Sequence, residues 1–431
     1  MLERFFKLKE HKTSIATELS AGLSTFLTMS FIIAVNPGIL SEAGIDFAAG
    51  FIATILATIL GTLIMGLYAR WPVAVAPGMG LNAYFAFVVV LGYGLSWQQA
   101  LTAVFVSSLA FFLFSITRIR SWLILSIPAE MQIAITAGIG LFLAMIGLQG
   151  AGLIIDNPDT LVGLGQLDNP QTMLALAGLV LMAALDKLGI KGSILITILG
   201  LSAFGWLTGL ASFNGIVSSP PMASAAFSLD FSALTTTAFL SVVFVMFFVD
   251  FFDTTGTLTA IAEPAGLKEK EGKIKNLDKA VLADTSASIF GSLLGTSNMT
   301  TYLESAAGLR AGGRTGLVAV TVAVLFAACL FFEPLFSSIP GFATAPALIY
   351  VAIGFFGGLR QIDWADMSVA LPVVLTVFLM PLTFSIAAGI SVGFLTYVAV
   401  RILSGRSSTL SPGIMMITSF GLIWIVLQYA V

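Results

Sequence analysis

The sequence predicts an all-α polytopic membrane protein with about fourteen transmembrane segments. Of its 431 residues, 58% are hydrophobic and only 10% are charged, a composition that differs from that of soluble domains. A bilayer core about 30 Å thick requires roughly 20 apolar residues per helix, and apolar runs of this kind recur from residue 14 onward. The first fourteen residues are charged and lack the pattern of a cleaved signal peptide, so we expect the first span to remain in the mature protein.

The apolar runs form two sets of seven, separated by a more polar segment. The first set lies near residues 14–36, 47–68, 72–91, 100–117, 133–148, 172–188 and 192–208, and the second near 237–260, 280–295, 296–312, 315–333, 343–358, 368–384 and 386–403. We therefore divide the chain into a first repeat (1–208), an outer linker (209–236) and a second repeat (237–431). Seven spans per repeat place the two halves in opposite orientations, which is typical of inverted-repeat transporters.

A further apolar run near residues 411–430 does not fit this count. It either lies along the membrane or replaces a span that has been divided wrongly.

The positions of the basic residues support the map, because Lys and Arg in short loops accumulate on the cytoplasmic side. The intervening segments 37–46, 149–171 and 209–236 carry Asp or Glu but neither Lys nor Arg. We therefore expect a multi-pass protein of the cell membrane whose N-terminus is cytoplasmic. The basic residues occur at the N-terminus and in alternate loops, at Arg70, Arg118, Arg120, Lys187, Lys191, Lys268, Lys270, Lys273, Lys275, Lys279, Arg310, Arg314, Arg360, Arg401 and Arg406.

Two spans are short and interrupted, at corresponding places in the two repeats. The first is WPVAVAPGMGLNAYFAF, residues 71–87. Pro72 and Pro77 cannot donate backbone hydrogen bonds, and Gly80 lowers helix propensity, so this span should begin extended and become helical near Met79.

The second interrupted span is LLGTSNMTTYLESAAG, residues 293–308. Its hydroxyl and amide side chains favour an extended start and are able to cap the helix that carries Glu304. Interrupted spans in both repeats point to a binding site near the membrane midplane. We expect Asn82 on one half-helix and Glu304 on the other to face that site.

Four acidic residues lie inside apolar stretches: Asp250, Asp253, Asp284 and Glu304. A carboxylate at the bilayer centre costs on the order of 2.5 kcal/mol or more, so such residues face a cavity and mark a transport site by default. Asp250 and Asp253 are three residues apart and share a helix face. Two close carboxylates disfavour double ionisation, which suits proton binding. A structural role for one of this pair, and for Asp284, stays open.

Other features exclude several classes of function. Cys329 is the only cysteine and His11 the only histidine, so we expect neither a disulfide nor a cysteine metal cluster, and proton transfer would use carboxylates. We find no phosphate-binding loop, metal-ligand cluster or nucleophile with a base, so we expect neither an enzyme nor a bound metal or cofactor. The lysines of residues 268–279 predict a solvated loop rather than a nucleic-acid patch. Glu18 lies near a span end, where we expect it at the membrane interface.

Four segments carry a more specific signal. They are APGMGLNAYF (76–85), FVDFFDTTGTL (248–258), LADTSAS (282–288) and GTSNMTTYLESAAGLRAGGRTGL (295–317). They resemble the signature segments of the bacterial and fungal purine nucleobase permeases, a branch of the nucleobase/ascorbate transporter family, and the resemblance covers essentially the whole chain.

The resemblance implies a fold of two inverted seven-span repeats, with spans 3 and 10 broken. A core domain would consist of spans 1–4 and 8–11, and a gate domain of spans 5–7 and 12–14. Substrate would bind between the two domains. It would cross by an elevator-like movement of the core, driven by proton symport.

The resemblance also assigns roles to residues. Asp253 and Glu304 would hold the purine, and Asn82 would shape affinity and selectivity. Asp284 would be needed for coupling or for the architecture of the site. Carboxylates accept hydrogen bonds from ring N–H and exocyclic amine groups, whereas an amide both donates and accepts. The full predicted substrate site is Asn82, Asp253, Glu304, Gly80, Phe252, Thr301 and Tyr302. The full predicted proton-coupling set is Asp253, Asp284, Glu304 and Asp250.

We therefore expect a proton-coupled importer of purine nucleobases. Guanine and hypoxanthine are favoured because segment 76–85 resembles their permeases more than those for adenine. The first alternative is a symporter for adenine, xanthine, uracil or ascorbate, and an alternative of another class is a channel or membrane scaffold without coupled transport. The expected partners are the purine, protons and the lipid bilayer, without nucleic acid, and a homodimer stays open.

Overall fold

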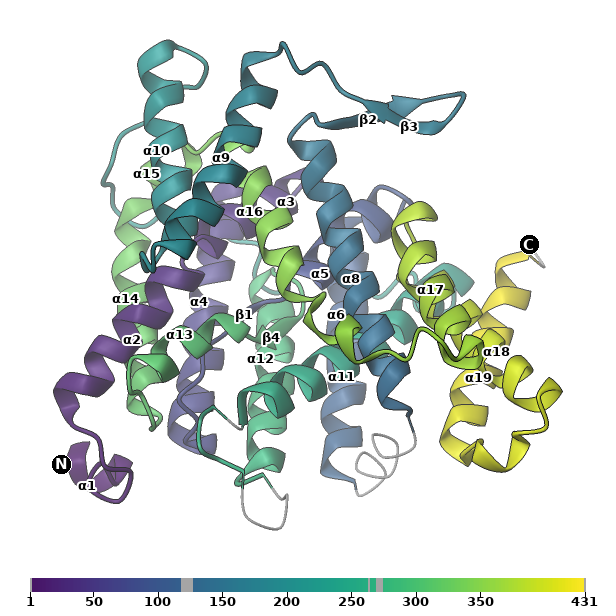
Figure 1. Ribbon diagram of the computed structural model, residues 1–431. Coiled ribbons are helices and arrows are strands. Elements are labelled where there is room, and N and C mark those ends of the chain that lie inside the picture. The colour runs from purple at the N-terminus through teal and green to yellow at the C-terminus, as the bar shows by residue number, and fades with distance from the viewer. Residues whose placement is uncertain (1, 118–126, 263, 269–273, 430–431) are drawn as a thin grey trace.

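The computed structural model describes residues 2–117, 127–262, 264–268 and 274–429, most of which are helical (Figure 1). A polytopic membrane protein is confirmed, because eight segments in this part of the chain are long and apolar enough to cross a bilayer. They are Ile15–Glu42, Phe47–Ala69, Trp97–Ile116, Ala129–Gly150, Thr237–Ala262, Leu317–Ser337, Gly341–Gln361 and Ile386–Leu403.

The N-terminal half is mostly helical and also contains the short strands β1, β2 and β3. Strands β2 and β3 pair with each other, and β1 pairs with β4 of the C-terminal half. The elements are α1 (Leu2–Phe6), α2 (Ile15–Met29), α3 (Ile32–Glu42), α4 (Phe47–Ile64), β1 (Val75–Pro77), α5 (Met79–Ala83), α6 (Trp97–Ile116), α8 (Ala129–Gly150), β2 (Ile154–Asn157), β3 (Leu161–Leu164), α9 (Pro170–Lys187) and α10 (Ser193–Thr208). No regular element is assigned between Thr208 and Thr237, where the long linker was expected.

The C-terminal half repeats the pattern of long helices around one short strand. The elements are α11 (Thr237–Ala262), α12 (Leu277–Leu294), β4 (Met299–Thr301), α13 (Ala306–Arg310), α14 (Leu317–Cys329), α15 (Glu333–Ser337), α16 (Gly341–Gly354), α17 (Met367–Leu382), α18 (Ile386–Leu403) and α19 (Pro412–Tyr429). The apolar run that did not fit the span count is helix α19, which packs against α18.

Two details differ from the sequence prediction. The first span does not end near residue 36, because α3 continues through Pro37 to Glu42. The segment 149–171, which was expected to be a loop, contains the hairpin β2–β3, and this hairpin projects from the end of the molecule opposite the N-terminus (Figure 1). The predicted basic positions Arg118, Arg120, Lys270 and Lys273 lie outside the described residues.

The two interrupted spans meet as a pair of antiparallel strands. In β1 and β4, Val75 lies opposite Thr301 and Pro77 opposite Met299. The pairing extends by one bond at one end, where the Gly78 N–H donates to the Asn298 carbonyl at 2.8 Å. Each strand leads into a short helix, and α5 begins at Met79, as the sequence predicted. Extended backbone inside a membrane protein needs such internal partners, because the bilayer core supplies none.

The helices pack in two groups. In the first group, α12 contacts α4 and α6, α14 contacts α2 and α4, and α11 contacts α6. In the second group, α8 contacts α16 and α17, α17 contacts α18, and α9 contacts α10 and α16. The groups meet where α5 and α11 contact α8 and where α2 contacts α10. Both strands β1 and β4 belong to the first group, close to this boundary (Figure 1).

Glu18 of α2 is fully buried, so the expectation of an interfacial position was wrong. Its carboxylate accepts hydrogen bonds from the backbone N–H of Arg314 at 2.9 Å and from the backbone N–H and hydroxyl of Thr315 at 3.1 and 2.7 Å. Several donors on one carboxylate compensate for its burial. Glu18 therefore fixes the loop that joins the second broken span to α14.

Replacing Glu18 by alanine should destabilise the protein. The Glu18→Ala variant leaves the buried N–H groups of Arg314 and Thr315 without an acceptor, and each such group costs about 1–3 kcal/mol. We expect the thermal unfolding midpoint in detergent to fall by several degrees. Glu10→Ala is the control, since Glu10 forms an exposed ion pair with Lys7. Equal midpoints for Glu18→Ala and the wild type would contradict the assigned role.

Candidate functional site

The segment from Asn298 to Thr301 supplies hydrogen-bond donors to three buried or partly buried aspartates. On one face of the strand, the Thr300 hydroxyl donates to Asp253 at 2.8 Å and the Asn298 amide donates to Asp250 at 3.2 Å. Alternate residues of a strand point to the same face, and residues three apart on a helix do so too. The spacing of Asn298 and Thr300 thus matches the spacing of the two aspartates on α11.

The opposite face of β4 contacts α12. There the Thr301 hydroxyl donates to one oxygen of Asp284 at 2.7 Å, and the Thr254 hydroxyl of α11 donates to the other at 2.6 Å. Asp284 is fully buried with both oxygens occupied, so it joins α11, α12 and β4.

The polar side chains before Glu304 were expected to cap the short helix, and this was wrong. The turn Leu303–Ser305 and α13 begin without a side-chain cap. The hydroxyls of Thr300 and Thr301 are directed at carboxylates instead. A charged acceptor gives a stronger hydrogen bond than the neutral partners available at a helix end.

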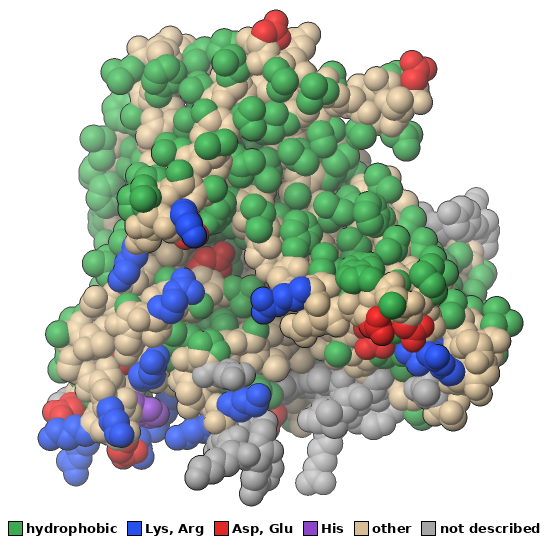
Figure 2. Space-filling view, viewed as in Figure 1, with side chains coloured by type: hydrophobic (Ala, Val, Ile, Leu, Met, Phe, Trp, Pro, Cys, Tyr) green, Lys and Arg blue, Asp and Glu red, His purple; other side chains and the backbone are tan. Residues whose placement is uncertain are grey.

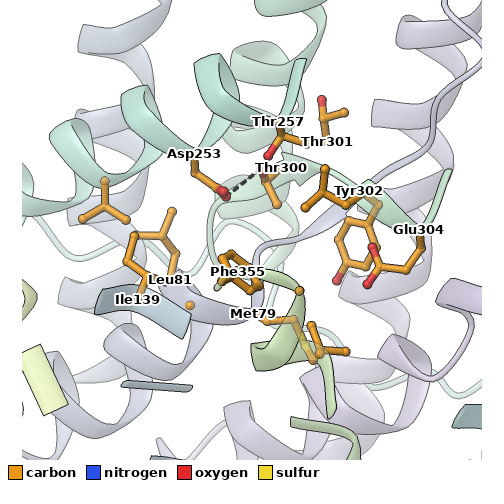
Figure 3. Close-up of a pocket in the computed structure, with 15 residues that line it drawn as sticks. Met79, Leu81, Ile139, Asp253, Thr257, Thr300, Thr301, Tyr302, Glu304 and Phe355 are labelled. Carbon is orange, nitrogen blue, oxygen red and sulfur yellow. Dashed lines mark hydrogen bonds between the residues drawn. The ribbon is translucent and has the colours of Figure 1, made fainter. Parts of the chain in front are cut away.

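A cavity of about 100 Å³ lies beside this network, at the boundary between the two helix groups. Asp253 and Glu304 lie on opposite sides of it, and Phe355 lies between them in the view of Figure 3. Both acidic side chains are partly exposed. The lining residues from the first helix group are Met79, Gly80, Leu81, Val249, Asp253, Thr257, Thr300, Thr301, Tyr302, Leu303 and Glu304, and those from the second are Ile139, Val351, Gly354 and Phe355.

Two lining residues are held by specific contacts. The Tyr302 hydroxyl donates to the Pro77 carbonyl at 2.7 Å, which fixes the ring against the wall of the cavity. Gly80 faces Ile139 of α8, and a Cβ atom added at Gly80 would lie 2.5 Å from the Ile139 Cγ2 atom. Glycine therefore fits where α5 approaches α8 across the boundary between the groups, and a larger residue would displace the Ile139 side chain.

The structure brings together five of the predicted substrate residues: Asp253, Glu304, Gly80, Thr301 and Tyr302. It places Asn82 and Phe252 elsewhere. Neither side chain lines this cavity, although both lie within one turn of residues that do.

Asn82 is fully buried behind the cavity, in a chain of amides and hydroxyls. Its Nδ2 donates to Oδ1 of Asn36 at 2.8 Å, and Nδ2 of Asn36 donates to the hydroxyls of Thr54 at 2.7 Å and Thr296 at 2.9 Å. This chain joins α5 to α3, α4 and the segment before β4. Through Asn36, Asn82 of the first broken span is therefore linked to Thr296 at the start of the second.

Phe252 and Asp250 also lie behind the cavity wall. Phe252 packs against the rings of Phe248 and Phe251, with centroid distances of 6.2 and 5.4 Å. Asp250 is 1% exposed and contacts Asn298. Its Oδ1 atom has no hydrogen-bond partner among the described residues.

Sequence reasoning missed several residues of the site. Thr257 follows Asp253 by four positions, so helical spacing places both on one face and could have identified it. Asn36 is an isolated amide in an apolar run, which was a usable signal. Ile139, Val351 and Phe355 carried no signal in the sequence, because each is an apolar residue in an apolar span.

The arrangement favours a small planar ligand. Carboxylates at two sides accept hydrogen bonds from N–H groups on separate edges of such a ligand, while the apolar walls and the Phe355 ring cover its faces. Among the residues that the structure describes, no group of three or more His, Cys, Asp or Glu side chains is placed to hold a metal ion.

Comparisons with solved structures identify the fold. The transmembrane domain of the cyanobacterial bicarbonate transporter BicA superposes with a TM-score of 0.65 at 17% identity, over 86% of this chain and 96% of that one. The murine anion transporter Slc26a9 in its inward-facing state gives a TM-score of 0.65 at 11% identity, over 94% of this chain and 72% of that one. The chain therefore has the fold of these membrane transporters.

Sequence comparisons are more specific. A model of the permease family Xan_ur_permease matches residues 16–392. The adenine permease AdeP of Escherichia coli (strain K12) is 42% identical over 97% of this chain and 94% of its own. The guanine/hypoxanthine permease PbuO of Bacillus subtilis (strain 168) is also 42% identical, over 94% of this chain and 96% of its own. A putative permease of Methanocaldococcus jannaschii is 46% identical over 94% of this chain and 93% of its own. The chain therefore belongs to the nucleobase permease family.

Proposed function

We propose that this protein imports purine nucleobases together with protons, with guanine and hypoxanthine favoured. The observation that carries this proposal is the pair Asp253 and Glu304, which face each other across a small cavity with apolar walls. A purine base is planar and carries N–H groups on more than one edge, so each carboxylate accepts a hydrogen bond from it. The purine permeases among the relatives support the same substrate class.

The chain is proposed to cross the membrane in fourteen spans, arranged as two inverted repeats. The eight long apolar segments, the helices α9, α10, α12 and α17 and the two broken spans together make this number. The first helix group is the proposed core domain and the second the proposed gate domain. The N-terminus is assigned to the cytoplasm, in agreement with the Lys and Arg side chains that gather at its end of the molecule (Figure 2).

In the proposed complex the core recognises the base and the gate covers it. Asp253 is held by Thr300 and accepts from one edge of the base, and Glu304 accepts from another. Phe355 of the gate stacks on a ring face. Asn82 acts on affinity from behind, because its bond to Asn36 fixes α5, which carries Gly80 into the cavity wall. Phe252 acts in the same indirect way, by packing behind Asp253.

Proton coupling is proposed to depend on the carboxyl groups of the core. Two carboxylates that face one small cavity disfavour double ionisation, so binding of a neutral base at Asp253 and Glu304 is linked to proton uptake. Asp250 is a second proton-holding group, because its Oδ1 atom is buried without a partner among the described residues, and an uncompensated buried charge is costly. Asp284 receives two hydroxyl donors and orders the site around them.

The movement is proposed to be an elevator-like shift of the core along the gate. One contact between the two groups at the site is that of Gly80 with Ile139, which involves no hydrogen bond. A smooth apolar contact of this kind favours sliding of packed helices.

The preference among purines rests on segment 76–85 alone. AdeP and PbuO are equally identical to this chain, at 42%, so overall similarity does not rank adenine against guanine and hypoxanthine.

Uptake of labelled hypoxanthine into proteoliposomes tests the function. We expect accumulation against a gradient that increases when the outside is acidified and is abolished by a protonophore. Unlabelled guanine should compete strongly, and adenine, xanthine, uracil and ascorbate weakly. Absence of hypoxanthine uptake would refute the preferred substrate, while downhill flux without accumulation would favour a channel.

The carboxylate variants test the site in the same assay. Asp253→Asn and Glu304→Gln should each lower uptake by at least tenfold, because an amide that replaces a carboxylate loses a charge-assisted hydrogen bond of about 1.5–3 kcal/mol. Asp156→Asn in the exposed hairpin is the matched control. Uptake at the wild-type rate in both site variants would show that the base binds elsewhere.

Substitution of Thr300 tests how Asp253 is positioned. Thr300→Val keeps the shape of the side chain but removes the donor to Asp253, so KM should rise about tenfold. Thr300→Ser retains the hydroxyl and should keep KM near the wild-type value. The assignment fails if the valine and serine variants have the same KM.

Substitution of Gly80 tests the contact between core and gate. Gly80→Ala places a methyl group against Ile139, so the uptake rate should fall about tenfold, and Ile139→Ala in the same chain should restore part of it. Gly341→Ala is the control, because a Cβ atom there meets nothing within 4 Å. Wild-type uptake by Gly80→Ala would exclude a tight contact during transport.

A further inference from the structure

A second cavity, of about 370 Å³, adjoins the substrate cavity and is called the vestibule below. The two cavities share Leu303, Glu304, Val351 and Gly354 as lining residues, so these residues border both of them. Figure 2 shows a hollow on this face of the molecule in which basic side chains surround acidic ones. The polar side chains that line the vestibule are Thr28, Asp186, Ser193, Glu304, Arg310 and Tyr350.

Charged side chains line both walls of the vestibule. Asp186 at the end of α9 and Tyr350 of α16 come from the gate. Arg310 at the end of α13 and Glu304 come from the core. The vestibule thus offers acceptors on both walls and a guanidinium donor on one. This set of groups complements a base edge that carries both an N–H and a carbonyl or ring nitrogen.

Gate and core are in close contact beside Gly192, which lines the vestibule. The Lys191 Nζ atom donates to the Ser24 hydroxyl of α2 at 2.9 Å. Next to it, Gly192 has φ +76°, and a Cβ atom there would lie 3.1 Å from the Leu27 carbonyl. Glycine is favoured by both the positive φ and the close approach. The vestibule is therefore bordered by a close approach of the two helix groups, and it is larger than the substrate cavity.

We propose that the vestibule is a second binding subsite for the purine base, through which the base leaves toward the cytoplasm. The proposal rests on the proposed function. Asp186 accepts an N–H of the base and Arg310 donates to its carbonyl or ring nitrogen. Glu304 lines both cavities, so the base keeps one carboxylate contact while it moves from Asp253 to Asp186. At least one polar group of the base therefore stays hydrogen-bonded during the transfer.

Transport measured from each side of the membrane tests this subsite. Labelled hypoxanthine is supplied to right-side-out and inside-out vesicles that contain the full chain. We expect Asp186→Asn and Arg310→Gln to raise the KM measured from the cytoplasmic side at least fivefold and to slow efflux, while the KM from the outside stays within twofold. A purely structural role would alter both sides or neither.

Matched controls separate charge from position. Asp156→Asn and Arg360→Gln remove the same charges at exposed positions outside the vestibule and should leave both KM values unchanged. Equal KM values from the cytoplasmic side for the wild type, Asp186→Asn and Arg310→Gln overturn the subsite alone. Absence of purine uptake by the wild type overturns the proposed function and the subsite with it.

Discussion

The structure depends on the backbone pairing of β1 with β4. Two spans are extended in the interior of a membrane protein, where an unpaired N–H or carbonyl costs several kcal/mol. Each strand supplies the partners that the other lacks, and Pro77, which has no N–H, contributes its carbonyl to the Tyr302 hydroxyl. Residues more than 220 positions apart are thereby fixed side by side. The pairing also sets the register of every polar side chain on β4.

The arrangement of the carboxyl groups follows from that register. Asn298 and Thr300 point to α11 and Thr301 to α12, so three aspartates from two helices are each held by a neighbouring donor. The gate contributes only apolar side chains and a glycine to the substrate cavity. The polar side chains that line the cavity therefore all come from the first helix group, and the second group provides an apolar wall. In the proposed mechanism, this division lets the core shift along the gate without breaking polar contacts to the ligand.

Sequence reasoning singled out residues that conflict with their surroundings. Asp253 and Glu304 stand out because charges in apolar spans are costly, and the helix start at Met79 follows from Pro77 and the glycines beside it. Sequence reasoning failed where contacts with distant residues determine the direction or the burial of a side chain. The direction of Asn82 depends on Asn36, 46 positions away, and Glu18 is buried because Thr315 faces it. Ile139 and Phe355 are ordinary apolar residues until the fold places them at the cavity.

The most direct test of the account is a crystal or cryo-EM structure of the full chain with hypoxanthine bound. We expect density for the base between Asp253 and Glu304, with N–H groups of the base at hydrogen-bond distance from both carboxylates, about 2.7–3.2 Å, and with Phe355 against a ring face. Density for the base that touches neither carboxylate would contradict it.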